Sequence, residues 1–211
     1  MGIGATVRRM FGRHERFVSE LWRAAFVNLD DFVTQVHGWA PKPDKILEVG
    51  CGEGAGTERL AVAYPDASIV AIDIAANLGR LYNGRSKKVV FRQVPITELA
   101  KTEVGTFDLI VMCDVLHHIP ENLRADVIAA VRALLAPGGS FVCKDWMRTA
   151  TPIHWAAYAA DRWLTGDRIR YATLAEAEAL FVASFGPSPV HARGTIRPWR
   201  NNFALLIRPP A

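Results

Sequence analysis

Short apolar segments alternate with longer amphipathic ones along most of this chain. The short segments are rich in β-branched residues, a pattern typical of strands buried in a parallel sheet. They predict seven strands, at residues 45–49, 68–72, 88–93, 107–112, 139–144, 189–195 and 202–208. Apolar positions at helical spacing predict helices at residues 55–64, 75–82, 121–136, 153–164 and 173–184. This rhythm predicts an α/β fold, a doubly wound and mostly parallel seven-stranded sheet with helices on both faces.

The last two predicted strands are joined only by a short connection through Arg197, Pro198, Trp199 and Arg200. Parallel neighbours need a crossover of about a dozen residues or more, whereas antiparallel neighbours need only a tight turn. We therefore expect the last strand to run antiparallel to its partner.

Two segments lie outside this alternation. Residues 13–38 carry apolar residues at helical spacing: Phe17, Leu21, Ala24, Ala25, Val27, Phe32, Val33 and Val36. Pro41 and Pro43 then end the helix before the first strand. Residues 146–172 follow a strand's carboxyl end, the side on which open α/β sheets bind their ligands. This connection is far longer than a tight loop needs, and it is rich in Trp, Tyr, His and Arg. Each segment could cover a ligand or simply pack on the sheet.

The composition is that of an ordinary soluble domain, with 50% apolar and 22% charged residues and a net charge of +4. Basic residues are spread along the chain, which favours a solvated surface over a nucleic-acid interface. Three separated cysteines predict neither a disulfide nor a zinc site. The sequence shows no apolar run of membrane-spanning length and no signal peptide. We expect a cytoplasmic protein, monomeric or homodimeric, without nucleic-acid or membrane partners.

The strongest signal follows the first predicted strand, where Glu48 precedes the run Gly50-Cys51-Gly52-Glu53-Gly54. Glycines in this place allow a sharp turn and a close approach of the backbone to a ligand. The helix after them presents unpaired N–H groups to an anionic or polar ligand. Because Asp73 lies about 20 residues on, the run also satisfies the dinucleotide-binding pattern. The loop could therefore bind a dinucleotide or a different nucleotide-type cofactor.

The pattern Glu48-x-Gly50-x-Gly52-x-Gly54 resembles the first motif of the class I S-adenosylmethionine-dependent methyltransferases. Three later segments are similar to the same family: Val70–Ile74, Phe107–Ile119 and Leu134–Gly139. Together they cover about residues 46–146. The resemblance implies the cofactor S-adenosylmethionine and a small-molecule type of methyltransferase. Chain length, the long connection after the fifth strand and this resemblance together predict a single domain over residues 1–211, with a helical lid (1–44), a cofactor-binding core (45–145), a substrate cap (146–172) and a C-terminal helix and strand pair (173–211).

The resemblance assigns the cofactor to residues along the carboxyl edge of the sheet: Glu48, Gly50, Cys51, Gly52, Gly54, Asp73, Ile74, Pro95, Ile96 and Cys113. Asp73 would accept both ribose hydroxyls, although it could instead cap the predicted helix at 75–82. The family often carries an acid where this chain has Pro95. Adenine would then be held by the backbone at Ile96 and by Ile74, unless a register slip brings in Glu98 or Gln93.

Two histidines follow the fourth predicted strand, and His117 stands where metal-free O-methyltransferases of this family place a general base. Imidazole titrates near neutrality and suits proton removal, with His118 as the second candidate. In other members such a pair only shapes the cofactor floor. Asp114 and Asp145 follow adjacent strands and could approach each other, but we expect no metal.

The remaining candidates would line the acceptor pocket: Asp145, Tyr158, Asp161, Tyr171, Arg197 and Asn202. Arg197 could also be a solvated turn residue. The chain has neither the Asn/Asp-Pro-Pro-Tyr/Phe run of amino-methylating enzymes nor the Pro-Cys nucleophile of cytosine methylation. We expect O- or N-methylation of a small, partly apolar or aromatic metabolite. A protein or RNA methyltransferase, an NAD(P)-dependent reductase and a non-catalytic cofactor-binding regulator remain as alternatives.

Overall fold

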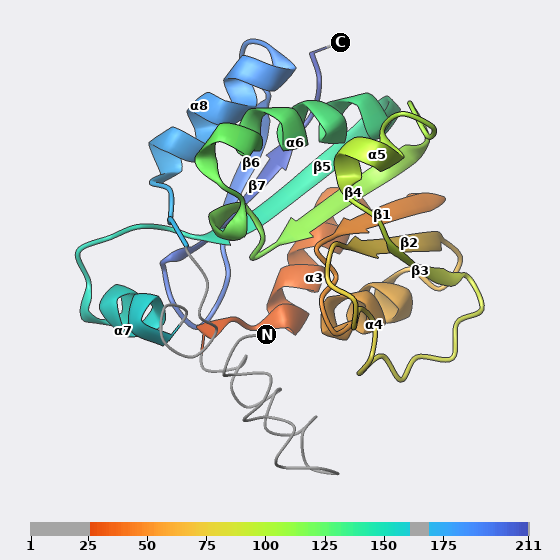
Figure 1. Ribbon diagram of the computed structural model, residues 1–211, viewed down its shortest axis with the longest axis horizontal. Helices are drawn as coiled ribbons and strands as arrows, with labels where there is room; N and C mark the ends of the chain where they lie inside the picture. The colour runs from red at the N-terminus through yellow and green to blue at the C-terminus, as the bar shows by residue number, and fades with distance from the viewer. Residues whose placement is uncertain (1–25, 161–168, 211) are drawn as a thin grey trace.

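The computed structural model describes residues 26–160 and 169–210, which fold around one sheet (Figure 1). The strands are β1 (Lys45–Val49), β2 (Ser68–Asp73), β3 (Val89–Gln93), β4 (Phe107–Cys113), β5 (Leu135–Trp146), β6 (Val190–Thr195) and β7 (Asn202–Ile207). Their order in the sheet is β3-β2-β1-β4-β5-β7-β6. Strands β1 to β5 pair in parallel, while β7 is antiparallel to both β5 and β6. The predicted doubly wound α/β fold and its antiparallel last strand are confirmed, and β7 lies inside the sheet rather than at its edge.

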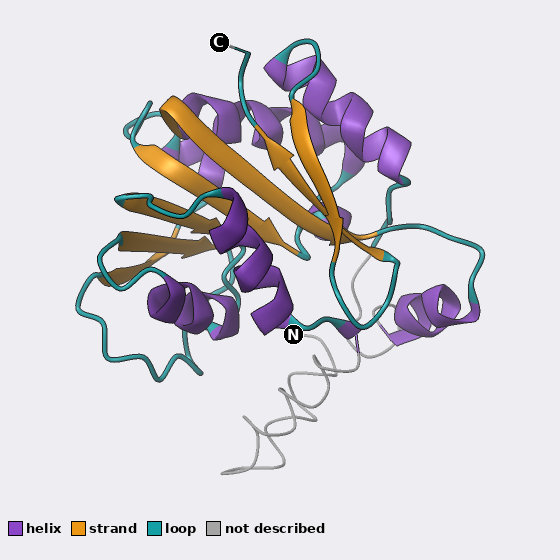
Figure 2. Cartoon of the chain, turned by 180° about the vertical axis from the view of Figure 1, so that it is seen from behind, coloured by secondary structure: helices purple, strands orange, loops and turns teal. Residues whose placement is uncertain are grey.

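Helices cover both faces of this sheet (Figures 1 and 2). They are α3 (Leu29–Trp39), α4 (Ala55–Ala63), α5 (Ile96–Leu99), α6 (Glu121–Leu134), α7 (Pro152–Ala160) and α8 (Leu174–Phe185), with a 3-10 turn η2 at Leu116–His118. Helices α3 and α4 cover one face, and α5, α6 and α8 cover the other. Because side chains alternate along a strand, Ile46 packs toward α3 and α4 while Leu47 packs toward α6. Both side chains are fully buried, as a parallel strand between two helical layers requires.

The predicted helix at 75–82 is wrong. Its backbone turns instead, because Gly79 and Leu81 donate their N–H groups to the carbonyls of Gly52 and Glu53, at 2.8 and 2.9 Å. Gly79 also has a positive φ of 65°, which a helix does not allow. This segment is therefore laid against the glycine loop, and its backbone hydrogen bonds go to that loop rather than within a helix.

At the N-terminal side, α3 begins at Leu29 because Asn28 caps it and accepts a hydrogen bond from the N–H of Asp31 at 2.9 Å. The predicted helix over 13–38 is thus interrupted within its described part. Its earlier residues Phe17, Leu21, Ala24 and Ala25 lie outside the described residues. Within residues 26–160 and 169–210, no helix combines the length and the apolar character needed to cross a membrane.

Candidate active site

The loop after β1 has the backbone that its glycines predict. Gly50, Gly52 and Gly54 all have positive φ, of 74°, 50° and 93°. A Cβ at Gly50 would overlap the side chain of Val115, and one at Gly54 would lie 2.9 Å from Cβ of Tyr82. At Gly52 a Cβ would meet no atom of the described residues within 4 Å. The loop is therefore packed from behind at two glycines and open above the third, where a ligand can approach the backbone.

Asp73, at the end of β2, is joined to this loop by its side chain. Its Oδ2 accepts a hydrogen bond from the N–H of Gly52 at 2.8 Å, and its Oδ1 accepts one from Ala75 at 2.8 Å. With no helix at 75–82, the alternative of a helix cap is wrong. Ile74 follows and is 75% exposed, so a carboxylate and an apolar surface lie side by side at the glycine loop.

Glu48 lies beneath the loop and is 5% exposed. The hydroxyl of Thr57 donates to its Oε2, and a Cβ at Gly56 would overlap its Oε1. Burial raises the pKa of Glu48 to about 7, and the hydrogen bond from Thr57 opposes this shift only in part. Within the loop, burial also raises the pKa of the Cys51 thiol, which therefore stays protonated and behaves as a small apolar side chain.

The third strand brings the expected adenine side close to Asp73. Val94 donates its N–H to the carbonyl of Asp73 at 3.1 Å, which places Pro95 and the first turn of α5 beside the end of β2. Gln93 donates from Nε2 to the carbonyl of Ile74 at 3.1 Å. Glu98 pairs instead with Lys101 at 2.8 Å, and both side chains are exposed by more than half. Of the two register alternatives, Gln93 is therefore the one beside the strand end.

The two histidines lie in η2, directly after β4. Nδ1 of His117 is hydrogen-bonded to Oδ1 of Asp145, and the N–H of His117 donates to Oδ2 of the same carboxylate at 3.0 Å. Both residues are buried, with 5% and 2% exposure. Burial alone would raise the pKa of Asp145, but the charge and hydrogen bond of His117 outweigh it, so the pKa is lowered. Asp145 thus holds the imidazole of His117, whereas His118 is exposed with its ring centroid 4.1 Å from that of His117.

Aromatic residues of the segment 146–172 lie next to His117. The Tyr171 ring centroid is 4.8 Å from that of His117 and 5.2 Å from that of His154. His154 is buried, and its Nδ1 accepts a hydrogen bond from Nε1 of Trp146 at 3.2 Å. Burial lowers the pKa of His154, and the charge of Arg148 adds to this effect, so the ring stays neutral. Sequence reasoning did not select His154 and Trp146 as site residues.

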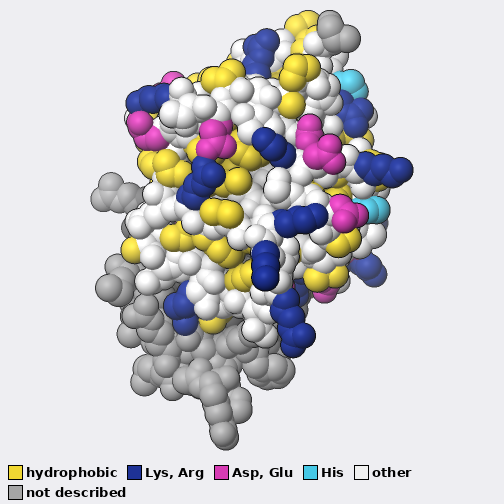
Figure 3. Space-filling view, turned by 90° about the vertical axis from the view of Figure 1, so that its right-hand side faces the viewer, with side chains coloured by type: hydrophobic (Ala, Val, Ile, Leu, Met, Phe, Trp, Pro, Cys, Tyr) yellow, Lys and Arg dark blue, Asp and Glu magenta, His cyan; other side chains and the backbone are white. Residues whose placement is uncertain are grey.

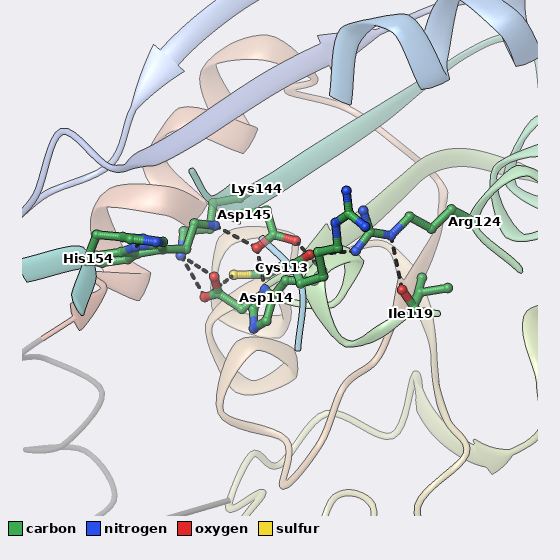
Figure 4. A network of polar contacts seen from close by, with 10 residues as sticks. Cys113, Asp114, Ile119, Arg124, Lys144, Asp145 and His154 are labelled. Carbon is green, nitrogen blue, oxygen red and sulfur yellow. Dashed lines mark hydrogen bonds and ion pairs between the residues drawn. The ribbon is translucent and has the colours of Figure 1, made fainter. Parts of the chain in front are cut away.

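Arg124 anchors the return of this segment. Its buried guanidinium donates to the carbonyl of Ile119 at 3.0 Å and to that of Arg170 at 2.6 Å (Figure 4). The N–H of Arg170 donates in turn to the carbonyl of His117 at 3.0 Å. Residues 169–171 are therefore fixed to the histidine turn, which places Tyr171 on His117.

The other predicted acceptor residues are placed differently. Tyr158 is 39% exposed on α7, and Asp161 lies outside the described residues. Arg197 forms an ion pair with Asp31 of α3 at 2.9 Å and is 76% exposed, as its turn alternative predicts. Asn202 is fully buried and donates from Nδ2 to the carbonyl of Phe26 at 2.6 Å. Both of these side chains hold the N-terminal part of the fold to the sheet.

A further charged residue, Lys144 of β5, was missed. Its side chain is 1% exposed, and Nζ lies 2.6 Å from both carboxylate oxygens of Asp114 (Figure 4). Asp114, His117 and Asp145 hold ligand-type atoms within 4.8 Å of one another. In this cluster the Lys144 ammonium already neutralises Asp114, and Asp145 is bonded to His117. A single lysine within an apolar strand was the sequence signal for this pair.

Comparison with known proteins shows what this chain is similar to. A family model described as a methyltransferase domain matches residues 47–141. The ubiquinone biosynthesis O-methyltransferase of Bordetella bronchiseptica is 38% identical over 99 residues, which are 45% of this chain and 39% of that protein. The protein of the same name from Psychrobacter arcticus is 28% identical over 193 residues, 86% of this chain and 73% of its own length. The chain thus spans about two fifths of the first relative and about three quarters of the second.

Solved structures share the fold at low sequence identity. One is the Burkholderia thailandensis 1,6-didemethyltoxoflavin-N1-methyltransferase with bound 1,6-didemethyltoxoflavin and S-adenosylhomocysteine, with a TM-score of 0.70 and 18% identity. The match covers 98% of this chain and 88% of that one. The pyocyanin biosynthetic protein PhzM matches with a TM-score of 0.72 and 15% identity, over 97% of this chain and 61% of its own.

Proposed function

We propose that this chain, a class I S-adenosylmethionine-dependent methyltransferase, methylates an oxygen or nitrogen of a small, partly apolar or aromatic metabolite. The observation that carries the proposal is the His117–Asp145 pair at the carboxyl edge of the sheet. His117 follows β4, the strand that pairs with β1, and the glycine loop follows β1. A candidate base and a nucleotide cradle are therefore neighbours.

The residues of the loop fit the cofactor. The space above Gly52 admits a ligand against the backbone, and each oxygen of Asp73 keeps acceptor capacity beyond its one backbone hydrogen bond. We assign the ribose hydroxyls to Asp73, and the adenine to Ile74, Gln93 and the Pro95–Ile96 turn. S-adenosylmethionine, when bound, supplies a methyl group activated by a sulfonium. The role of the protein is to orient this methyl group toward the acceptor, since correct orientation accounts for much of the acceleration in such a displacement.

His117 is the proposed general base. We assign Nδ1 as the donor to the carboxylate of Asp145, which leaves Nε2 as the basic nitrogen of the neutral ring. Asp145 fixes this tautomer and would stabilise the imidazolium formed when Nε2 takes the proton of the acceptor. His118, exposed beside it, is the second candidate.

The acceptor class follows from the surroundings of this base. Tyr171, His154 and Trp146 form an aromatic wall next to His117, which suits a flat and partly apolar molecule. Tyr158 and Asp161 of the cap are further candidates to contact it. The relatives named O-methyltransferases favour an oxygen acceptor, while the toxoflavin-related structure is an N1-methyltransferase.

The charge distribution favours a small acceptor over RNA. On the face at the β3 edge of the sheet, basic side chains are interspersed with acidic and apolar ones (Figure 3). Arg80 pairs with Glu53, and Arg92 pairs with Glu103. A strand of RNA requires a continuous positive track, and mixed charges on this face do not provide one.

Calorimetric titration of the protein with S-adenosylmethionine, S-adenosylhomocysteine, NADH and NADPH tests the proposal. We expect binding of the two adenosyl compounds and none of the nicotinamide cofactors. Incubation with S-adenosylmethionine and a panel of hydroxylated aromatic compounds, read by mass spectrometry, should show a gain of one methyl group. Binding of NADPH without S-adenosylmethionine would instead identify a reductase, and cofactor binding without transfer to any acceptor class, proteins and RNA included, would identify a regulator.

A further inference from the structure

Lys144 holds Asp114 in two ways. The side-chain ammonium lies 2.6 Å from both oxygens of the Asp114 carboxylate, and the carbonyl of Lys144 accepts the N–H of Asp114 at 2.9 Å. Burial alone would lower the pKa of Lys144, but the charge of Asp114 outweighs it and raises the pKa. The buried ammonium therefore stays charged, with Asp114 as its direct ion-pair partner and the charge of Asp145 adding to the effect.

Asp114 has a backbone conformation that needs such support. Its φ is 55°, in the left-handed region that residues other than glycine rarely adopt. Aspartate tolerates this region better than most residues, but the conformation still persists only where the surrounding structure holds it. Two contacts from Lys144 provide that hold.

The next residue, Val115, links the conformation of Asp114 to the position of the glycine loop. Val115 lies against Gly50 so closely that a Cβ on the glycine would overlap the valine side chain. Gly50 follows Val49, which pairs with Met112 across β1 and β4. The two chain segments therefore leave the sheet side by side, and the direction that the backbone takes at Asp114 decides where Val115 meets the loop.

We propose that Lys144 is a positioning residue of the cofactor site, which clamps Asp114 in its left-handed conformation and thereby keeps Val115 against Gly50. The inference rests on the proposed function, because it assigns the glycine loop to S-adenosylmethionine. It also explains the carboxylate cluster without a metal ion: Lys144 is the cation of Asp114, and the imidazole of His117 is the partner of Asp145.

The test is a reversal by a double variant. Lys144→Met removes the ammonium from the Asp114 carboxylate and keeps only the backbone contact, and Asp114→Gly removes the carboxylate that pairs with the buried Lys144 ammonium. We expect each to weaken S-adenosylhomocysteine binding by about tenfold or more. The double variant Asp114→Gly/Lys144→Met should bind within about threefold of the wild type, because glycine adopts a positive φ freely and no unpaired ammonium remains at position 144. Lys101→Met, which removes an exposed surface lysine, is the matched control and should not change binding.

Calorimetry with S-adenosylhomocysteine measures all five proteins, and thermal unfolding checks that each is folded. If the double variant binds S-adenosylhomocysteine as weakly as the single variants, the proposal is wrong. The Asp114 carboxylate itself would then be needed for binding. Unchanged binding by Lys144→Met would overturn the proposal too. If a single variant does not fold, the double variant alone decides: binding within about threefold of the wild type supports the proposal, and weaker binding overturns it. Failure of the wild type to bind any adenosyl compound is a separate outcome, which removes the proposed function and this inference with it.

Discussion

Nδ1 of His117 lies against the carboxylate of Asp145, and the two residues are 28 positions apart in the chain. Strands β4 and β5 pair in parallel, with Met112 opposite Cys143, so the segments that follow them emerge side by side. Asp145 lies near the end of β5 and His117 in the turn after β4. The topology of the sheet thus builds a His–Asp pair beside the glycine loop, as ligand sites in open α/β sheets are built from strand ends.

Replacing Asp73 should weaken cofactor binding. Asp73→Ala removes both the proposed contacts to the ribose hydroxyls and the acceptor of the Gly52 N–H, so we expect a loss of roughly 1.5–3 kcal/mol. Asp73→Asn keeps one acceptor oxygen and should lie between Asp73→Ala and the wild type. Calorimetry with S-adenosylmethionine measures the loss. Unchanged affinity in folded Asp73→Ala would show that the ribose lies elsewhere.

Two glycines of the same loop should respond differently to alanine. Gly50→Ala places a methyl group into Val115, so we expect a destabilised fold, by about 1–3 kcal/mol. Gly52→Ala meets no atom of residues 26–160 and 169–210 within 4 Å, although its φ of 50° adds strain. Its methyl group projects toward the cofactor space, and it should mainly weaken S-adenosylmethionine binding. Thermal unfolding and calorimetry on both variants separate the effects, and equal losses in both assays would contradict this division.

Glu48 should make stability depend on pH in a definite direction. Its pKa is about 7 in the fold against a usual value of 4.5, because burial disfavours the charged carboxylate. The folded state therefore binds its proton more tightly than the unfolded one, and stability falls as pH rises from 4.5 toward 7. The shift corresponds to about 3 kcal/mol. Urea unfolding of the protein and of Glu48→Gln between pH 5 and about pH 8 measures this, and the variant should lack that part of the pH dependence. A parallel decline in both proteins would assign the effect to another group.

The sequence predicted the parts of the molecule that local patterns determine. Buried strands show as short apolar runs, and the positive φ of Gly50, Gly52 and Gly54 leaves a glycine signature in the sequence. The segment 75–82 was misassigned because its hydrogen bonds reach back to Gly52 and Glu53, a contact that no local periodicity records. The helix signal there was outweighed by tertiary pairing.

The site was only partly predictable for the same reason. His117 was found by its place in a motif, but the role of Asp145 as its partner depends on the register of β4 against β5. Lys144 was missed because a lysine in an apolar strand has meaning only once its partner Asp114 is known. His154 likewise gained its place through a hydrogen bond from Trp146.

The last prediction concerns His117 as the general base. His117→Ala should lower turnover by about 10²–10⁴ while leaving S-adenosylmethionine affinity nearly unchanged, because it removes a proton acceptor and no proposed cofactor contact. The pH–rate profile should also lose an ionisation near neutrality. His118→Ala compares the two candidate bases, and because His118 is exposed in the same turn, its effect should be mild. If both variants are mild and alike, the pair only shapes the site. If S-adenosylmethionine affinity and activity fall together in His117→Ala, His117 contributes to cofactor binding, and the general base lies in the cap (146–172).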